Sequence, residues 1–458
     1  MIIANNNNKD KCNVPNLRFP EFSGEWEKCK VSELLDFYST NSLCWEQLEY
    51  DTENISNLHY GLIHVGLPTM VNLVQDRLPN IKDGNKPKNY ELCKEGDVAF
   101  ADASEDTNEV AKAIEFYNLN GRDVICGLHT IHGRDNKDRT VVGFKGYAFS
   151  STAFHNQIRR IAQGTKIYSI STKNFSECYI GIPSKVEQAK IASLLHLIDE
   201  RIVTQNKIIY KLKSLIRGIM VELQKRGLSN GTWKKVLLSN VLTERNELNK
   251  SLYPVYSVSV IQGIVNQMEY LGRSFAASDT SKYHVVHYGD LVYTKSPTGS
   301  FPYGIIKQSY NQNEVAVSPL YGVYEPKTFS TGVFLHEYFK SELNTLNYLH
   351  PLVQKGAKNT INIANQRFLE SYVAIPSNAN ELLAISKLLC SLNTKLEFLQ
   401  NILKQSQGQK QYLLEVVSKR WHNLFYILQF CYIFFWLCCF FLMHLATSCY
   451  IPIISGYK

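Results

Sequence analysis

One amphipathic segment occurs twice in the chain, and this repeat constrains the fold more than any other feature. "IPSKVEQAKIASLLHLID" begins at Ile182, and "IPSNANELLAISKLLCSLN" begins at Ile375. In both copies, apolar residues recur at alternating steps of three and four, which places them on one face of a helix and favours a long helix packed against a partner helix. The predicted packing seam consists of Ile191, Leu195, Ile198, Ile202, Ile209, Ile385, Leu389, Leu392, Leu396 and Leu403.

The starts of the two segments carry matching capping signals. Ser184 followed by Glu187 has the form of a capping box, and Asn378 with Glu381 occupies the same register in the second copy. The part of the first helix from Ile191 to Ile219 would be roughly 43 Å long at about 1.5 Å per residue. A rod of this length predicts a spacer. The alternative is two ordinary amphipathic helices in two unrelated cores.

The sequence before each predicted helix is also repeated. Trp26 corresponds to Trp233, and the turn "GDVAF" at Asp97 corresponds to "GDLVY" at Asp290. "QGTK" at 163–166 likewise corresponds to "KGAK" at 355–358. The order in both halves is a tryptophan start, a strand-rich region, a Gly-Lys loop and a long helix, which indicates internal duplication.

The 458 residues suit two domains of about 150 residues with connecting helices. Short runs rich in Tyr, Phe and Val, such as "YPVYSVSVI", favour strands, and no ordered βαβ series is present, so the fold class is predicted to be α+β. The predicted organisation is a disordered N-terminal tail at 1–20, globules at 21–184 and 230–377, long helices at 185–225 and 378–417, and an atypical apolar tail at 421–458.

Sequence motifs for catalysis or metal binding are missing from the chain. There is no Gly-rich phosphate loop, nucleophile elbow or zinc-protease motif, and the eleven cysteines form no C-x-x-C pair or metal-ligand spacing. We therefore expect no catalytic residue, no metal and no cofactor, and reduced thiols in a cytoplasmic protein. His129 and His132 come nearest to a catalytic cluster, but a ligand-contacting surface is the favoured interpretation.

Basic and amide side chains gather in polar loops of both halves. The chain has 49 Lys and Arg against 41 Asp and Glu, and the loops include "GRDNKDR" in the first half and "KGAKNTINIANQR" in the second. Lys and Arg neutralise phosphates, while Arg, Asn and Ser read base edges, although ordinary solvated loops are the alternative. The predicted DNA-binding residues are His129, His132, Arg134, Lys137, Arg139, Lys166, Tyr293, Lys295, Ser296, Thr298, Lys355, Lys358, Asn359 and Arg367.

These features together resemble a known family. The opening "VPNLRFPEFSGEWEKCKVSELL", the two Gly-Asp turns, the repeated helix and "KQYLL" near the end are similar to the specificity subunit of type I restriction-modification enzymes, over roughly residues 14 to 415. The resemblance implies two target-recognition globules separated by two long antiparallel helices. Each globule would read one half of a bipartite site in double-stranded DNA.

The same resemblance assigns the catalysis to partner chains. Modification subunits would carry S-adenosylmethionine and methylate adenine, and restriction subunits would use ATP to translocate and cleave DNA. This chain would be a non-catalytic DNA-recognition subunit. The competing hypotheses are an autonomous enzyme with a duplicated fold, a non-enzymatic protein scaffold, and an inactive rearranged copy.

The C-terminal segment departs from the family pattern. Residues 424–446 contain no Asp, Glu, Lys or Arg and are long enough to cross a bilayer. Lys419 and Arg420 precede the segment, which would place its start on the cytoplasmic side of a membrane. We favour an out-of-frame extension past a rearranged junction over a membrane anchor.

Overall fold

The computed structural model describes residues 18–273, 276–355 and 361–416. They form two compact units, of which unit 1 comprises the residues up to 203 and from 404 onward, and unit 2 comprises residues 204–403. No helix in these described ranges is long and apolar enough to cross a membrane. The segment 424–446 and nearly all of the predicted tail 1–20 lie outside the described residues.

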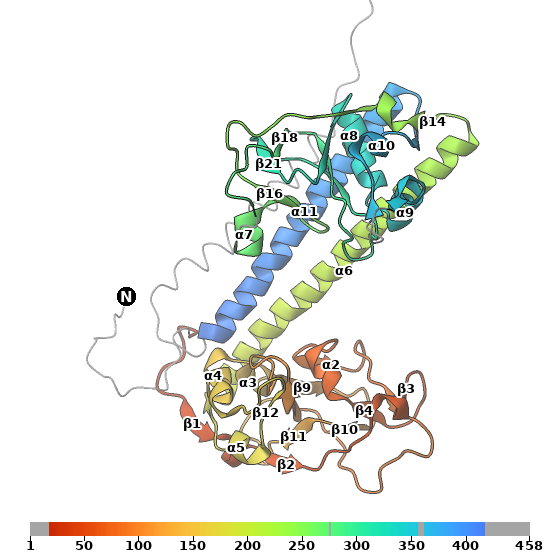
Figure 1. The fold of residues 1–458 in the computed structure, drawn as a ribbon. Helices are drawn as coiled ribbons and strands as arrows, with labels where there is room; N and C mark the ends of the chain where they lie inside the picture. Colours follow the sequence, from red (N-terminus) through yellow and green to blue (C-terminus); the bar gives the residue numbers. More distant parts are fainter. Residues whose placement is uncertain (1–17, 274–275, 356–360, 417–458) are drawn as a thin grey trace, which may run out of the picture. The chain divides into compact units, whose positions relative to one another are not determined.

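Two long helices contribute to both units. Helix α6 spans Lys185–Ser229 and α11 spans Ala379–Val416. Both begin where their caps predict, because the Ser184 hydroxyl accepts a hydrogen bond from the Glu187 amide (3.4 Å) and the Asn378 side chain accepts one from the Asn380 amide (2.8 Å). Figure 1 draws both helices as unbroken elements.

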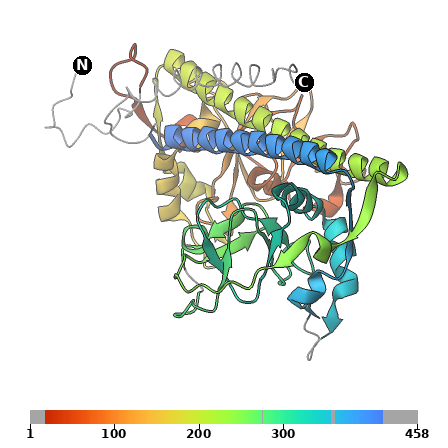
Figure 2. The same cartoon turned by 90° about the horizontal axis from the view of Figure 1, so that it is seen from above.

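Within each unit, the local parts of α6 and α11 pack antiparallel. In unit 2, Gln205 of α6 donates from Nε2 to the carbonyl of Leu399 in α11 (2.9 Å). Trp233, which follows α6, donates to Glu381 in the first turn of α11 (2.8 Å), so the end of α6 lies near the start of α11. In unit 1, Leu195 shares a small core with Leu413, and Asp199 pairs with Lys410 (2.7 Å). Figure 2 shows α6 and α11 from above. All ten predicted seam positions are buried or half-buried.

The globule of unit 1 contains two main sheets. The five-stranded sheet has the order β2 (Asp36–Tyr38), β11 (Thr130–Arg134), β7 (Val98–Ala101), β9 (Ala113–Asn118) and β5 (Met70–Asn72). The four-stranded sheet has the order β10 (Val124–Cys126), β4 (Ser56–Leu58), β6 (Asn80–Ile81) and β3 (Leu48–Glu49). The smaller elements are β8 (Ala103–Ser104), β12 (Tyr168–Ser169), α1 (Val31–Leu34), α2 (Tyr60–His64), α3 (Lys145–Phe149), α4 (Thr152–Ile161) and α5 (Thr172–Ser176).

The globule of unit 2 contains one larger sheet and several strand pairs. The four-stranded sheet has the order β15 (Leu242–Glu244), β22 (Gly322–Pro326), β19 (Leu291–Tyr293) and β20 (Ile306–Gln308). The strand pairs are β16 (Tyr256–Ser259) with β17 (Gly263–Asn266), β18 (His284–Val286) with β21 (Val315–Val317), and β23 (Gln354–Lys355) with β24 (Ile361–Asn362). The helices are α7 (Gln267–Leu271), α8 (Phe329–Tyr338), α9 (Glu342–Leu349) and α10 (Asn365–Phe368).

Both globules join their long helix through the same arrangement. The first strand of each globule pairs antiparallel with its last strand, β1 (Glu27–Lys30) with β13 (Tyr179–Ile182) and β14 (Trp233–Leu237) with β25 (Tyr372–Pro376). A tryptophan at the start of each pair donates from Nε1 to a glutamate in the first turn of the helix, Trp26 to Glu187 (3.2 Å) and Trp233 to Glu381 (2.8 Å). The prediction of two strand-rich globules and two long paired helices is confirmed.

This arrangement gives the two glutamates a role that the capping-box prediction missed. Glu187 is buried, and its carboxylate accepts hydrogen bonds from Arg18 (2.7 Å) as well as from Trp26. Its partners are therefore in the globule rather than at the helix cap. A negative charge in the first turn also interacts favourably with the helix dipole.

Replacing the core seam residue Leu389 with alanine tests the packing of the helices in unit 2. Leu389 is fully buried, whereas its neighbour Leu388 is 45% exposed. We expect Leu389→Ala to lower the free energy of unfolding by about 2–5 kcal/mol, because it leaves a cavity in the core. Leu388→Ala should change it by about 0.5 kcal/mol or less. Urea unfolding of both variants measures the difference, and equal effects would contradict the observed seam.

Candidate nucleic-acid interface

A Gly-Asp turn precedes a central strand in each globule. Gly96 and Gly289 have φ of 86° and 93°, a left-handed conformation that favours glycine. The following aspartate closes the turn by accepting a backbone hydrogen bond, Asp97 from the Lys94 amide (2.8 Å) and Asp290 from the amide three residues earlier (2.9 Å). The repeated sequence motif is therefore a repeated local structure with a buried carboxylate.

Arg134 holds the turn in the first globule. It donates from Nε and Nη2 to the two carboxylate oxygens of Asp97 (2.9 and 2.8 Å) and from Nη1 to Glu91 (2.6 Å). His132 contacts the same carboxylate through Nε2 (2.8 Å). The side chains of Arg134 and His132 are 8% and 0% exposed, so both lie out of reach of DNA in this structure. The structure argues against their predicted base-reading role and gives them a structural one.

Hydrogen bonding also determines the charge of Asp97. Burial alone would raise the pKa of Asp97, but the hydrogen bonds from His132 and Arg134 outweigh burial and hold it below its ordinary value. Asp97 is therefore ionised at neutral pH and paired with Arg134. The folded state depends on this pair, because removing one partner of a buried ion pair leaves the other charge uncompensated.

In the second globule, the aspartate of the Gly-Asp turn pairs with an arginine from a different place in the sheet. Arg245, directly after β15, donates from Nε to Asp290 Oδ2 (2.8 Å) and from Nη2 to Oδ1 (3.2 Å). Strand β15 occupies the edge position that β2 has in unit 1, whereas Arg134 lies on the strand next to that edge. Burial raises the pKa of Asp290 above its ordinary value, since the bonds from Arg245 only partly oppose it. Sequence reasoning missed Arg245, because the two arginines do not align in the repeat.

Tyr293 is also a core residue rather than a surface residue. Its side chain is buried, and its hydroxyl donates to the Tyr303 carbonyl (2.7 Å). Burial raises the pKa of Tyr293. The ring stacks on Phe368 (centroids 4.9 Å apart). These contacts argue against the predicted DNA contact at this position.

The other candidates in the first globule lie at or near the surface. His129 is half exposed, and Lys137 and Lys166 are exposed. Lys137 donates from Nζ to the Glu33 carbonyl (2.8 Å). Arg139 is partly buried, pairs with Glu27 (2.5 Å) and donates to the sulfur of Cys29 (2.9 Å), so its guanidinium is already partly satisfied.

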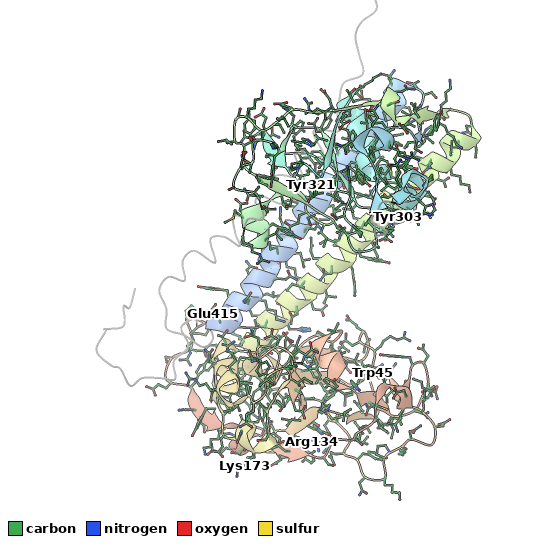
Figure 3. All side chains as sticks on the ribbon, in the orientation of Figure 1. Trp45, Arg134, Lys173, Tyr303, Tyr321 and Glu415 are labelled. Carbon is green, nitrogen blue, oxygen red and sulfur yellow. The ribbon has the colours of Figure 1, made fainter. Side chains whose placement is uncertain are left out.

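His129 belongs to a row of aromatic rings that sequence reasoning did not find. The aromatic row consists of Trp45, His59, Tyr60 and His129, with successive ring centroids 4.4, 4.7 and 5.3 Å apart. Trp45 is 45% exposed, and Figure 3 labels its position in unit 1. The row joins three segments that are distant in sequence, and no local pattern predicts it.

Hydrogen bonds hold the two histidines of the aromatic row. His59 accepts a hydrogen bond at Nδ1 from the Gly61 amide (3.2 Å) and so caps α2. His129 has φ of 54° and contacts Asp102 through Nδ1 (3.2 Å). The imidazole of His129 therefore has a fixed orientation with half of its surface exposed. In the tautomer that donates from Nδ1 to Asp102, Nε2 is an acceptor and suits a donor edge of a base.

The candidates of the second globule lie on separate elements. Lys295, Ser296 and Thr298 are partly or fully exposed in the loop after β19, and burial lowers the pKa of Lys295. Arg367 lies in α10 and donates to the Leu352 carbonyl (3.0 Å). The backbone of Lys355 is in β23, whereas Lys358 and Asn359 lie outside the described residues.

Arg134→Met tests the structural role of this arginine. We expect a loss of about 3–5 kcal/mol in the free energy of unfolding at pH 7, because Asp97 would remain buried without its partner. The unpaired carboxyl would have a raised pKa, so the loss should shrink as the pH falls from 7 towards 5. Urea unfolding at both pH values measures this.

Arg77→Met is the matched control, since Arg77 pairs with Asp51 on the surface, where both side chains are mostly exposed. It should leave stability unchanged. Normal stability of the Arg134 variant, with relaxed DNA specificity in one half-site, would instead restore the DNA-reading hypothesis.

Comparisons with known proteins address the fold. Neither a protein-family model nor a curated protein matches the chain. The crystal structure of the S subunit of a type I restriction-modification system from M. genitalium is similar, with a TM-score of 0.56 and 14% identity over 89% of this chain and 100% of that one.

Two further structures are less similar. One comes from a study of complex assembly and conformational transition of the type I R-M system, with a TM-score of 0.46 and 13% identity over 86% of this chain and 97% of that one. The other is the HsdS subunit from Thermoanaerobacter tengcongensis, with a TM-score of 0.37 and 14% identity over 86% and 96%. The fold of this chain is assigned from the similarity to the M. genitalium S subunit. The chain has the fold of the specificity subunits of type I restriction-modification systems.

Proposed function

We propose that the chain is the sequence-specific DNA-binding specificity subunit of a type I restriction-modification complex. It recognises a bipartite site and directs adenine methylation and restriction by partner subunits. The observation that supports this best is the duplicated attachment, in which a tryptophan ties each strand-rich globule to the first turn of a long helix. Two globules built on one plan suit the reading of two half-sites.

The energetics of DNA recognition favour such a duplication. One globule that reads a few base pairs discriminates by about 1–3 kcal/mol per mismatched pair. Linking two globules makes the second binding event intramolecular and so increases the overall affinity. Helices α6 and α11 each supply residues to both units and would set the number of unread base pairs between the half-sites.

In the first globule, the aromatic row would contact bases. The apolar edge of Trp45 suits a thymine methyl group, and His129 Nε2 suits a donor edge in the major groove. Lys137, Arg139 and Lys166 would contact phosphates. Such contacts position the protein without reading sequence.

In the second globule, the loop after β19 and the segment around β24 would carry the DNA contacts. Arg367 and the exposed hydroxyls suit base edges, and the lysines suit phosphates. The proposed residues are Lys295, Ser296, Thr298, Lys355, Lys358, Asn359 and Arg367.

Substitutions in the aromatic row should change one half of the recognised sequence. Trp45→Ala and His129→Ala would each remove about 1–3 kcal/mol of discrimination at the base pair contacted. The measurement is methylation sequencing of a genome that expresses the variant with its modification subunit. Tyr50→Ala is a matched control, because Tyr50 is an equally exposed aromatic residue of unit 1 outside the row.

The two variants should relax one half-site, and the control should relax neither. Changes in both half-sites would contradict the assignment of one half-site to each globule. Methylation without any sequence preference would favour the scaffold hypothesis.

The proposed modification subunits need a docking surface, and the long helices offer one. On α6, within unit 2, Ile208 and Leu215 are 43% and 53% exposed and lie seven residues apart on the same helix face. Exposed apolar residues at heptad spacing suit a partner helix. We propose that the modification subunits bind this face.

The double substitution Ile208→Lys and Leu215→Lys tests this surface. Placing two charges in an apolar contact should cost at least about 2 kcal/mol of binding, or about a 30-fold rise in Kd for the modification subunit. Isothermal titration calorimetry with the purified subunit measures it. Asn206→Lys, which adds a charge at an exposed polar position of the same helix, should leave the Kd unchanged. Equal affinity of the double variant and the wild type would place the docking surface elsewhere.

A further inference from the structure

Three side chains with metal-ligand atoms converge inside unit 1. Cys93 precedes β7, Cys126 ends β10 and His132 lies in β11. The two sulfur atoms are 3.6 Å apart, and one ligand atom from each of the three residues lies within 4.8 Å of the other two. All three residues are at least 94% buried. They are distant in sequence, so no short metal-ligand motif predicts the cluster.

The environment of His132 indicates which ring nitrogen faces a ligand. Its Nε2 lies 2.8 Å from a carboxylate oxygen of Asp97. Because a carboxylate accepts in such a contact, Nε2 is the donor, and Nδ1 is the ring nitrogen left to bind a ligand. That Nδ1 atom is buried and has no hydrogen-bond partner in the described part of the chain.

An unpaired buried nitrogen is costly, and a metal ion would satisfy it. A buried acceptor without a partner has lost its hydrogen bonds to water and gained none in the protein. Histidines that bind metals regularly donate their other ring N–H to a carboxylate, which fixes the tautomer and the ring orientation. Asp97 provides that contact here, and Arg134 orients Asp97 in turn.

We propose that Cys93 Sγ, Cys126 Sγ and His132 Nδ1 bind a zinc ion. Zinc prefers tetrahedral sites of thiolate and imidazole ligands, with Zn–S distances of about 2.3 Å, which sets neighbouring sulfur atoms about 3.8 Å apart. The sulfur atoms of Cys93 and Cys126 are already at 3.6 Å. Three protein ligands leave a fourth position for a small ligand such as water.

Charge balance also supports zinc. Binding releases the protons of both thiols to solvent, and two thiolates with one Zn²⁺ give a neutral centre. A neutral centre is compatible with complete burial, whereas an uncompensated charge is not. A disulfide between the two cysteines would need the sulfur atoms to approach by about 1.5 Å to reach the bonded distance, and it would leave His132 Nδ1 without a partner.

The ion would connect the two sheets of the first globule. Cys126 belongs to the four-stranded sheet and His132 to the five-stranded sheet, while Cys93 lies just before the Gly-Asp turn. A zinc ion would therefore fix the Gly-Asp turn and both sheets in one arrangement. This structural role is independent of the proposed DNA recognition.

Metal analysis of the purified full chain tests the proposal. Wild-type protein dialysed against Zn²⁺ should retain about one zinc ion per chain, and Co²⁺ in its place should give thiolate-to-cobalt charge-transfer absorption. Cys93→Ser, Cys126→Ser and His132→Asn should each lose the ion or bind it at least about tenfold more weakly. Cys178→Ser should behave like wild type, because Cys178 is also buried but lies outside the cluster.

A measurement on the wild type alone covers the case in which the variants do not fold. Zn²⁺ should slow alkylation of Cys93 and Cys126 at least about tenfold, as followed by mass spectrometry of peptides, and leave that of Cys44 and Cys390 unchanged. Unchanged alkylation rates, a Cys93–Cys126 disulfide in the isolated protein, or binding of Cu⁺ without Zn²⁺ would each overturn the zinc assignment.

Discussion

A hydrogen bond from a tryptophan indole to a glutamate carboxylate connects each globule to the helix that follows it. In the first globule, Trp26 and Arg18 both donate to Glu187, which is almost fully buried. Loss of the glutamate would leave these donors unpaired, and such a loss costs more than the bond itself contributes. The same bond between Trp233 and Glu381 ties the second globule to α11. In each half of the duplication, the globule is thus fixed to the first turn of its long helix.

A second interaction found in both globules is an ion pair between an arginine and the buried aspartate of the Gly-Asp turn. Asp97 pairs with Arg134, which lies in β11. Asp290 pairs with Arg245, which directly follows β15. Both globules therefore contain the same Arg–Asp ion pair, but the arginine comes from a different position in each. Because the turn is held from within, the loops on the surface can differ in sequence without loss of the fold. A framework that tolerates changes in its loops would suit the proposed recognition of DNA half-sites.

The sequence predicted what depends on local spacing. The apolar period and the caps located both long helices, since these signals come from residues a few positions apart. The roles of Arg134 and His132 depend on Asp97, which lies more than thirty residues earlier, and the aromatic row and the Cys93 cluster depend on the same kind of distant contact. Gln205 is a polar residue among the apolar seam positions of α6, and its side-chain amide donates to the Leu399 carbonyl of the partner helix. A sequence pattern alone does not identify such partners.

Lengthening both helices tests most directly whether α6 and α11 set the distance between two half-sites. One heptad would be added to α6 after Gln205 and one to α11 before Leu399, at the level where these residues pair. Seven residues add about 10 Å of helix at about 1.5 Å per residue, or about three base pairs of DNA at about 3.4 Å each. Methylation sequencing should then show the same two half-sites with a longer unread spacer. An unchanged spacer, or altered half-sites, would contradict the account.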